Sequence, residues 1–227
     1  MNRIAVLSAG VFVVATGGAA VWWFGQGTEA PSVDVTAPSE TVSSTGDGQA
    51  DGATVTYALT SASRAMFVIA EELRGEPGIV TVTSSIVLGE VALDPADPVS
   101  ARLGTILVNA RDFTTDSSNR NRAIRGPILD ADTFEFVEFA PVSIDWLASS
   151  GSEVFFTVTG DLTIRDATNS VIFDVVATLN GDETITGTAE ATVDRTDWGL
   201  NIPSAPGVAN VSETVTLRLE FVAAPTA

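Results

Sequence analysis

The side chains that could perform chemistry are few, and the most prominent are closely spaced acidic pairs. They are Asp94 with Asp97, Asp130 with Asp132, and Asp194 with Asp197. Paired carboxylates can bind calcium, or act as the acid and base of a glycosidase when their surroundings separate their pKa values. None of the pairs has the ligand spacing of an EF-hand loop. In so acidic a chain the pairs are predicted to be solvated turn residues, so we expect no catalytic residue and no metal site.

Three residue types are absent from the sequence: histidine, cysteine and lysine. Their absence excludes Ser-His and Cys-His catalysis, zinc held by histidine or thiolate, lysine Schiff bases and disulfide bonds. The formal net charge is −18 at pH 7. A nucleic-acid binder needs a basic footprint, and an acidic surface is repelled by anionic lipid headgroups. We therefore predict a protein that is not an enzyme, needs no cofactor and binds no nucleic acid.

One basic cluster stands out against this acidic composition, and it consists of Arg120, Arg122 and Arg125. These side chains could form ion pairs with nearby acidic residues. They could instead contact the polar headgroup or the phosphate of a lipid at the opening of a binding site. Both interpretations depend on which elements hold the cluster.

The N-terminal region is predicted to attach the protein to a membrane. Residues 4–24 carry no charge and are long enough to cross a bilayer as a helix. Arg3 precedes this stretch and Glu29 follows it, which favours a single pass through the cell membrane with the C-terminal domain outside the cytoplasm. The alternative is a signal peptide, whose cleavage would give a secreted protein, but the best candidate cleavage site is followed by Pro31. Residues 1–24 are therefore assigned to an anchor or signal segment.

The remaining chain divides into a linker and a β-domain. Residues 25–52 are rich in Gly, Ser, Thr, Pro and acidic residues, which predicts a disordered linker. In residues 53–227, short runs that alternate apolar and polar residues are separated by turn residues, as in "EVFFTVTGDLTI", "VIFDVVATL" and "ETVTLRLEFV". Such runs predict about eight antiparallel strands in a sandwich or a closed barrel. A helical pattern is confined to a short stretch near residues 118–124.

The inward faces of the later strands are predicted to be apolar, with a group of small residues, Gly187, Ala189 and Ala191, opposite large ones. Small residues could fit the taper of a barrel that is filled by its own side chains. They could instead leave space for a long, thin ligand. The predicted apolar lining consists of Phe156, Val158, Leu162, Ile164, Phe173, Val175, Ala177, Leu179, Ile185, Gly187, Ala189, Ala191, Val215, Leu217 and Leu219.

Two long segments carry ordered short motifs. One is "GDLTIRDATNSVIFDVVATL", followed later by "RTDWGL"; the other is "TDSSNRNRAIRGPILDADTFEFVEF". In their order and spacing these motifs resemble the YceI-like polyisoprenoid-binding family, over about residues 54–222. The matching positions are Thr115, Arg120, Ile124, Asp130, Phe134, Phe139, Thr163, Ile164, Thr168, Arg195, Trp198, Gly199 and Leu200.

This chain also departs from the pattern of the family that it resembles. Asn121 stands where the family usually has Asp, Asp166 where it has Gly, and Glu135 where it often has Pro. The histidine that is common after the first strands of the family is absent, with Ala70 or a neighbour in its place. If that histidine orients a headgroup, the choice of headgroup differs in this chain.

The resemblance implies a lipocalin-like antiparallel barrel with one short helix, which holds an isoprenoid chain such as that of a polyprenyl quinone. We therefore expect a non-enzymatic protein, monomeric or dimeric, that sequesters or transports this lipid and is attached to the membrane by its N-terminal helix. The alternative hypothesis is a surface interaction or stress-response module whose barrel is filled by its own side chains.

Overall fold

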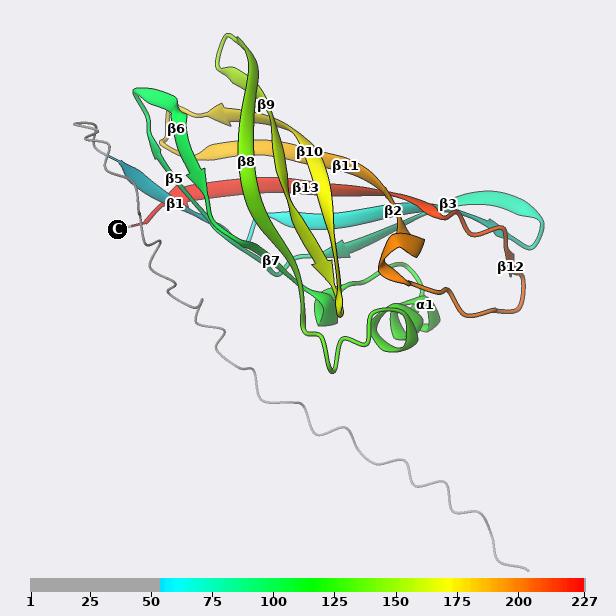
Figure 1. The fold of residues 1–227 in the computed structure, drawn as a ribbon. Helices are drawn as coiled ribbons and strands as arrows, with labels where there is room; N and C mark the ends of the chain where they lie inside the picture. The colour runs from blue at the N-terminus through cyan, green and yellow to red at the C-terminus, as the bar shows by residue number, and fades with distance from the viewer. Residues whose placement is uncertain (1–53, 227) are drawn as a thin grey trace, which may run out of the picture. The chain divides into compact units, whose positions relative to one another are not determined.

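The computed structural model describes residues 54–226, which form a curled antiparallel β-sheet with little helix (Figure 1). The predicted anchor, residues 1–24, and the predicted linker, residues 25–52, lie outside the described residues and stay predictions. Among the residues that the structure describes, no helix has both the length and the apolar character needed to span a membrane.

The strands and helical elements follow one another in this order. The strands are β1 (Val55–Leu59), β2 (Arg64–Leu73), β3 (Glu76–Ser84), β4 (Val87–Leu88), β5 (Glu90–Asp94), β6 (Asp97–Leu103), β7 (Ile106–Asn109), β8 (Phe136–Ser150), β9 (Glu153–Ile164), β10 (Ala167–Leu179), β11 (Ile185–Asp194), β12 (Val208–Ala209) and β13 (Thr214–Pro225). The helical elements are the 3₁₀ helices η1 (Ala110–Asp112) and η3 (Arg195–Trp198), the α-helix α1 (Ser118–Ala123) and the π-helical turn η2 (Ile124–Ile128).

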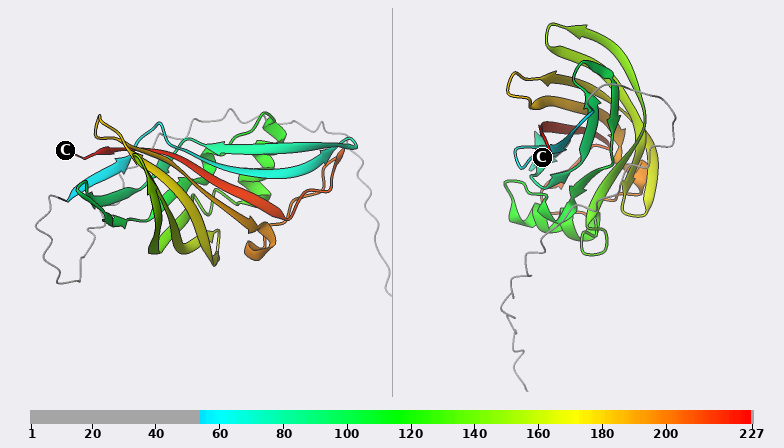
Figure 2. Two further views of the ribbon diagram at one scale, coloured as in Figure 1. Left: turned by 90° about the horizontal axis from the view of Figure 1, so that it is seen from above. Right: turned by 90° about the vertical axis from the view of Figure 1, so that its left-hand side faces the viewer.

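The strands form one sheet, in the spatial order β4-β7-β8-β9-β10-β11-β13-β1-β5-β6. The hairpin of β2 and β3 attaches through β2 to β13, and β12 pairs with β2. Only Gly89 separates β4, at one end of this path, from β5, which is next to the strand at the other end, and the sheet curls around its inward face (Figure 2).

The all-β class with one short helix is confirmed, but the expectation of about eight strands is wrong, because the sheet has 13. The stretch from β3 to β5 shows the physical reason. It reads as a nearly continuous β-prone run, but its partner changes twice: β3 pairs with β2, β4 pairs with β7, and β5 pairs with β1. The chain must bend at each change of partner, and each bend divides the run.

The long strands β8 to β11 and β13 form the main wall of the sheet. In β9 and β10, the alternation of apolar and polar residues places Val158, Leu162, Val171 and Val175 on the buried inward face. Tight turns set the registers of the hairpins. Between β2 and β3, for example, Arg74 (φ 56°) and Gly75 (φ 87°) are both left-handed, as a type I′ turn requires.

One end of the inward face is filled by side chains from outside the long strands; we call it the packed end. The indole Nε1 of Trp198, in η3, donates a hydrogen bond of 2.9 Å to the carbonyl oxygen of Leu162. Trp198 and Leu200 are buried against the sheet, and Ile124 from η2 belongs to the same cluster. Arg165, in the turn between β9 and β10, donates to the carbonyl oxygen of Ile128. α1 and the following η2, which together we call the helical segment, therefore cover this end of the wall.

Candidate functional site

The opposite end of the inward face encloses an apolar cavity of about 440 Å³, and we call it the hollow end. Its lining comes from strands throughout the described chain and consists almost wholly of aliphatic and aromatic side chains. The polar side chains that line it, Glu90, Ser152 and Arg218, are exposed to solvent. The interior of the cavity is therefore without a charged group that could polarise a bond.

Most of the lining residues predicted from sequence do line this cavity. They are Phe156, Val158, Leu162, Phe173, Val175, Ala177, Leu179, Ile185, Ala189, Leu217 and Leu219. Period-two alternation placed them correctly because β9, β10, β11 and β13 pair without a register shift over these residues.

Four predicted lining residues lie elsewhere, and three of them are buried side chains of the core. Ile164, Ala191 and Val215 point inward and are buried in the core cluster of Trp198 and Leu200, which also contains lining residues such as Ala189. These three are not among the residues that line the cavity. The alternation of apolar and polar residues predicts which face of the sheet a residue occupies, but it does not predict whether another element packs against that face.

Gly187 is the fourth residue, and it is small for a reason other than ligand space. A Cβ atom at this position would lie 2.5 Å from Cζ of Phe221 and would collide with the backbone carbonyl of Val176. Phe221 itself lines the cavity. Gly187 thus permits a close approach of two strands and of an aromatic ring, and it is not among the residues that line the cavity.

Sequence reasoning missed the half of the lining that comes from the first strands and from β8. Trp146 packs on Phe156 with a centroid distance of 4.7 Å, and Phe139 meets Phe173 edge to face at 5.0 Å. Further lining residues of this group are Leu59, Phe67, Val91, Leu93, Leu103, Phe113 and Ile144. The alternation in "FEFVEFAPVSIDW" was the available signal, but two β-bulges in β8, at 141–143 and 146–148, interrupt its period.

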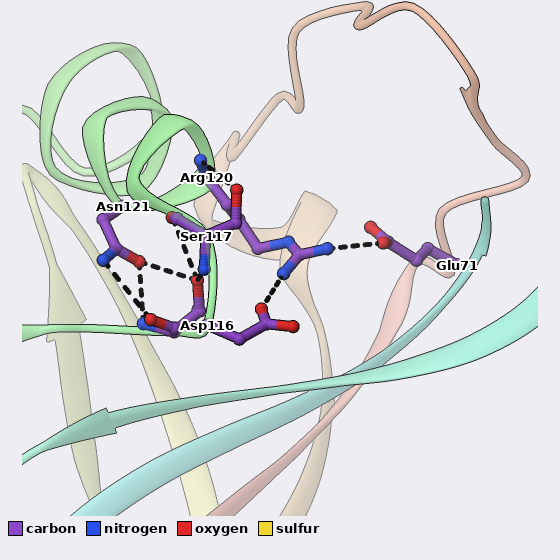
Figure 3. A network of polar contacts seen from close by, with 6 residues as sticks. Glu71, Asp116, Ser117, Arg120 and Asn121 are labelled. Atoms are coloured by element: carbon purple, nitrogen blue, oxygen red, sulfur yellow. Dashed lines mark hydrogen bonds and ion pairs between the residues drawn. The ribbon is translucent and has the colours of Figure 1, made fainter.

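The predicted basic cluster lies in α1 and η2, and none of its arginines lines the cavity. The guanidinium of Arg120 donates to Oε1 of Glu71 at 2.8 Å and to Oδ1 of Asp116 at 2.6 Å (Figure 3). Nε of Arg125 donates to the carbonyl oxygen of Phe113 at 2.9 Å, and Nη1 of Arg122 to Oδ1 of Asn119 at 3.5 Å. Of the three arginines, only Arg120 forms ion pairs, and its pair with Glu71 ties α1 to β2. Contact of the cluster with a headgroup stays a prediction.

Asn121 stands where the family pattern usually has Asp, and its side chain still supports the turn before α1. Its Oδ1 accepts hydrogen bonds from the backbone N–H and from the hydroxyl of Thr115, both at 2.7 Å. Next to it, the side chain of Ser117 caps the N-terminus of α1. An aspartate could accept the same two bonds, so the amide preserves the turn before α1 while it removes a charge (Figure 3).

The acidic pairs were predicted to lie in turns, and Asp130 and Asp132 do, whereas Asp94, Asp97 and Asp194 lie at strand ends and Asp197 lies in η3. Oδ1 of Asp94 accepts a hydrogen bond from the backbone of Ala96 within the turn between β5 and β6, and Oδ1 of Asp194 accepts one from the hydroxyl of Thr214. Asp130 adopts a left-handed φ of 47°. Within residues 54–226, no three acidic side chains gather closely enough to hold a metal ion.

A curled antiparallel sheet around an apolar cavity, covered at one end by a short helical segment, defines the class of this protein as a cavity-forming β-domain. Within that class, residues 57–223 match the YceI-like domain, and the chain belongs to this family. The resemblance seen in the sequence is thereby confirmed. No curated protein sequence matches the chain.

Solved structures share the fold at low sequence identity. BcnA of Burkholderia cenocepacia superposes with a TM-score of 0.57 at 19% identity, over 72% of this chain and 98% of that one. A polyisoprenoid binding domain from Saccharophagus degradans, implicated in plant cell wall breakdown, gives 0.58 at 13% identity, over 76% and 99%. The YCEI protein of Campylobacter jejuni gives 0.51 at 15% identity, over 64% and 84%.

Proposed function

We propose that this protein binds a polyisoprenoid lipid, such as an isoprenoid quinone, without converting it, and holds the apolar chain in the cavity of the hollow end. The observation that carries the proposal is the lining of the cavity. It gives a long hydrocarbon an almost wholly apolar surface, and its interior side chains include no group that could react with the ligand. The fold shared with a polyisoprenoid binding domain supports the choice of ligand class.

The energetics of such binding are favourable. A cavity of about 440 Å³ falls within the range in which proteins hold small ligands, about 300–1,000 Å³. Each buried methylene contributes about 0.8 kcal/mol before the cost of ordering the chain is subtracted. Because the polar lining residues Glu90, Ser152 and Arg218 are exposed, a polar headgroup would stay in water, and the cavity would select for the chain.

The cellular role that we propose is sequestration or transport of this lipid outside the cytoplasm by a domain tethered to the membrane. The uncharged stretch of residues 4–24 and the positively charged residue before it support this arrangement. Recovery of the full-length protein in the membrane fraction, with its C-terminal domain accessible to protease from outside, is the expected result. A mature N-terminus near residue 30 in a soluble fraction would show that the segment is a cleaved signal.

The direct test of lipid binding is organic extraction of the purified full-length protein followed by mass spectrometry. We expect an isoprenoid lipid at close to one molecule per chain. Ala189→Phe should then abolish binding of a fluorescent farnesyl analogue, because the new ring fills the cavity that Ala189 lines. Thr188→Phe is the matched control, since Thr188 lies next to it in β11 and is exposed.

Two results would contradict the proposal. One is a protein from which no lipid is recovered and which binds no analogue, and this result would favour the alternative of a self-filled interaction module. The other is equal loss of binding in Ala189→Phe and Thr188→Phe, which would show that the substitution acts through general instability of β11.

A further inference from the structure

Two strand edges that face the same cavity have no strand partner in the described chain. β6 pairs with β5 on one side only, and β8 pairs with β7 only over residues 136–139. Residues 140–150 of β8 pair with β9 alone. Such free edges are normally covered or blunted, because they attract other strands.

Both free edges contribute side chains to the lining of the cavity. Pro98, Ala101 and Leu103 come from β6, and Ile144 and Trp146 come from β8. The two strands are not hydrogen-bonded to one another. The hydrogen-bonded wall of the cavity is therefore interrupted between β6 and the free part of β8, and we call this seam the lateral slit.

The flanks of the lateral slit carry large apolar side chains that are exposed to water. Four large apolar residues of the described chain are more than three-fifths exposed, and three of them are Val142 (71%), Leu147 (64%) and Val99 (62%). The fourth, Ile79 (70%), lies in β3. Val99 lies in β6, and Val142 and Leu147 lie in β8.

The bulges of β8 account for part of this arrangement. Val142 and Leu147 are the extra residues of the two bulges, between Pro141 and Ser143 and between Trp146 and Ala148. A bulge alone prevents a free edge from pairing with another chain. That purpose would be served as well or better by charged residues, so it does not explain why both inserted residues are apolar.

The part of the cavity at the ends of the hairpins, which we call the acidic opening, is lined by exposed turn residues and differs in character. Gly151, Ser152 and Leu179 line the cavity there. The turns and strand ends around this opening carry the acidic residues Asp94, Asp97, Glu153, Asp182 and Glu183. A hydrocarbon chain that passed through this opening would have to displace water from several carboxylates, which is costly.

We propose that the lateral slit is the portal through which the apolar chain of a lipid passes between a bilayer and the cavity. This inference rests on the proposed lipid-binding function. Outside the cavity, the moving chain makes apolar contacts with Val99, Val142 and Leu147. Inside the cavity, it packs against Ile144 and Trp146. The headgroup remains in water, so the chain can slide in sideways without crossing the acidic opening.

The test measures uptake and release rates together with equilibrium affinity. Full-length protein in phosphatidylcholine vesicles is mixed rapidly with vesicles that carry a dansyl-labelled farnesyl analogue. The part of the tryptophan energy transfer that is lost in Trp146→Phe reports filling of the cavity, because Trp22, Trp23 and Trp198 are present in both proteins. In Val142→Asp and Leu147→Asp, uptake and release should both slow by about tenfold, because the chain must pass a carboxylate and partly desolvate it. Since both rates change together, the equilibrium affinity should stay the same.

The controls separate a portal from other effects. Ile172→Asp adds the same charge at an exposed position of β10 and should leave the rates unchanged. Leu147→Met keeps the flank apolar and should also leave them unchanged. Unaltered rates in Val142→Asp and Leu147→Asp, equal slowing in Ile172→Asp, or a weaker affinity without slower uptake would each overturn the portal. If the wild type takes up no analogue, the proposed function itself fails.

Discussion

The packed end and the hollow end lie on the same strands, yet the same type of side chain has a different environment at each. At the packed end, Ile164 and Val215 are buried in the core cluster that also contains Trp198 and Ile124. At the hollow end, Phe156 and Leu219 belong to the same inward face, but they border a cavity. Strand alternation is equally regular at both ends.

This difference shows that the cavity exists because one end of the sheet lacks a cover. The helical segment and η3 contribute the large side chains of Ile124, Leu129 and Trp198 to the core cluster, and none of these three lines the cavity. The hairpins at the hollow end close with short turns that add no bulky apolar residue to the interior. The following predictions compare the two ends, in order of decreasing expected effect.

The largest effect is expected from truncating the aromatic residue that fills the packed end. Trp198→Ala should lower the free energy of unfolding by about 3–5 kcal/mol, because it leaves a buried void and removes the hydrogen bond to Leu162. Trp146→Ala, at the hollow end, should cost only about 1–2 kcal/mol, since this ring already borders open space. Urea denaturation of both variants measures the difference, and equal losses would contradict the distinction between the two ends.

A matched pair in β11 sharpens the comparison. Ala191→Phe should destabilise the protein by about 1–3 kcal/mol, because it adds a ring to a filled region. Ala189→Phe, two residues away on the same face, should leave the free energy of unfolding unchanged or raise it slightly, because its ring enters the cavity and gains contacts. Denaturation in urea should therefore rank Ala189→Phe above Ala191→Phe; the reverse order would mean that the cavity is already filled.

The ion pair that holds the helical cover can be weakened without changing the core. The side chain of Glu71 is only 10% exposed, and Glu71→Gln would remove the charge that pairs with Arg120. We expect a loss of about 1–3 kcal/mol, because a half-buried guanidinium loses a charged partner. Glu190→Gln is the control, since the pair of Glu190 with Arg218 is exposed and should contribute at most about 1 kcal/mol. Thermal melts at low and high salt should show salt dependence mainly for the exposed pair.

The smallest effect is expected at Asp182, in the turn between β10 and β11. The hydroxyl of Thr184 donates to its Oδ1 at 2.7 Å and the backbone N–H of Thr184 at 3.1 Å, which lowers the pKa of this carboxyl below its ordinary value of 3.8. A lowered pKa stabilises the folded state above pH 3.8 and loses this contribution as the pH falls through the folded-state pKa. Asp182→Asn should therefore melt slightly below the wild type at neutral pH. The difference should vanish in strong acid, and a difference that grows in acid would refute the assignment.

The sequence could predict the face of each residue but not the boundaries of its strand. Val158, Val175 and Leu217 were assigned to the inward face because the period of two holds through long, regularly paired strands. The same rule missed Ile144 and Trp146, because each bulge in β8 shifts the period by one residue. The same rule also predicted one continuous run where the structure has the separate strands β3, β4 and β5. The breaks between them are changes of pairing partner, which depend on strands that are distant in the chain.

The sequence by itself determined the all-β class, the short helix near residue 120, the family motifs and the apolar character of the inward face, because these follow from local periodicity and residue type. Only the tertiary structure decided which inward positions are packed and which are hollow. Ala189 and Ala191 are identical in type and in face and both belong to the core cluster of Trp198, yet only Ala189 lines the cavity. The physical reason is that burial depends on the element that covers a face, and that element is brought there by contacts distant in sequence, such as Trp198 with Leu162 and Arg120 with Glu71.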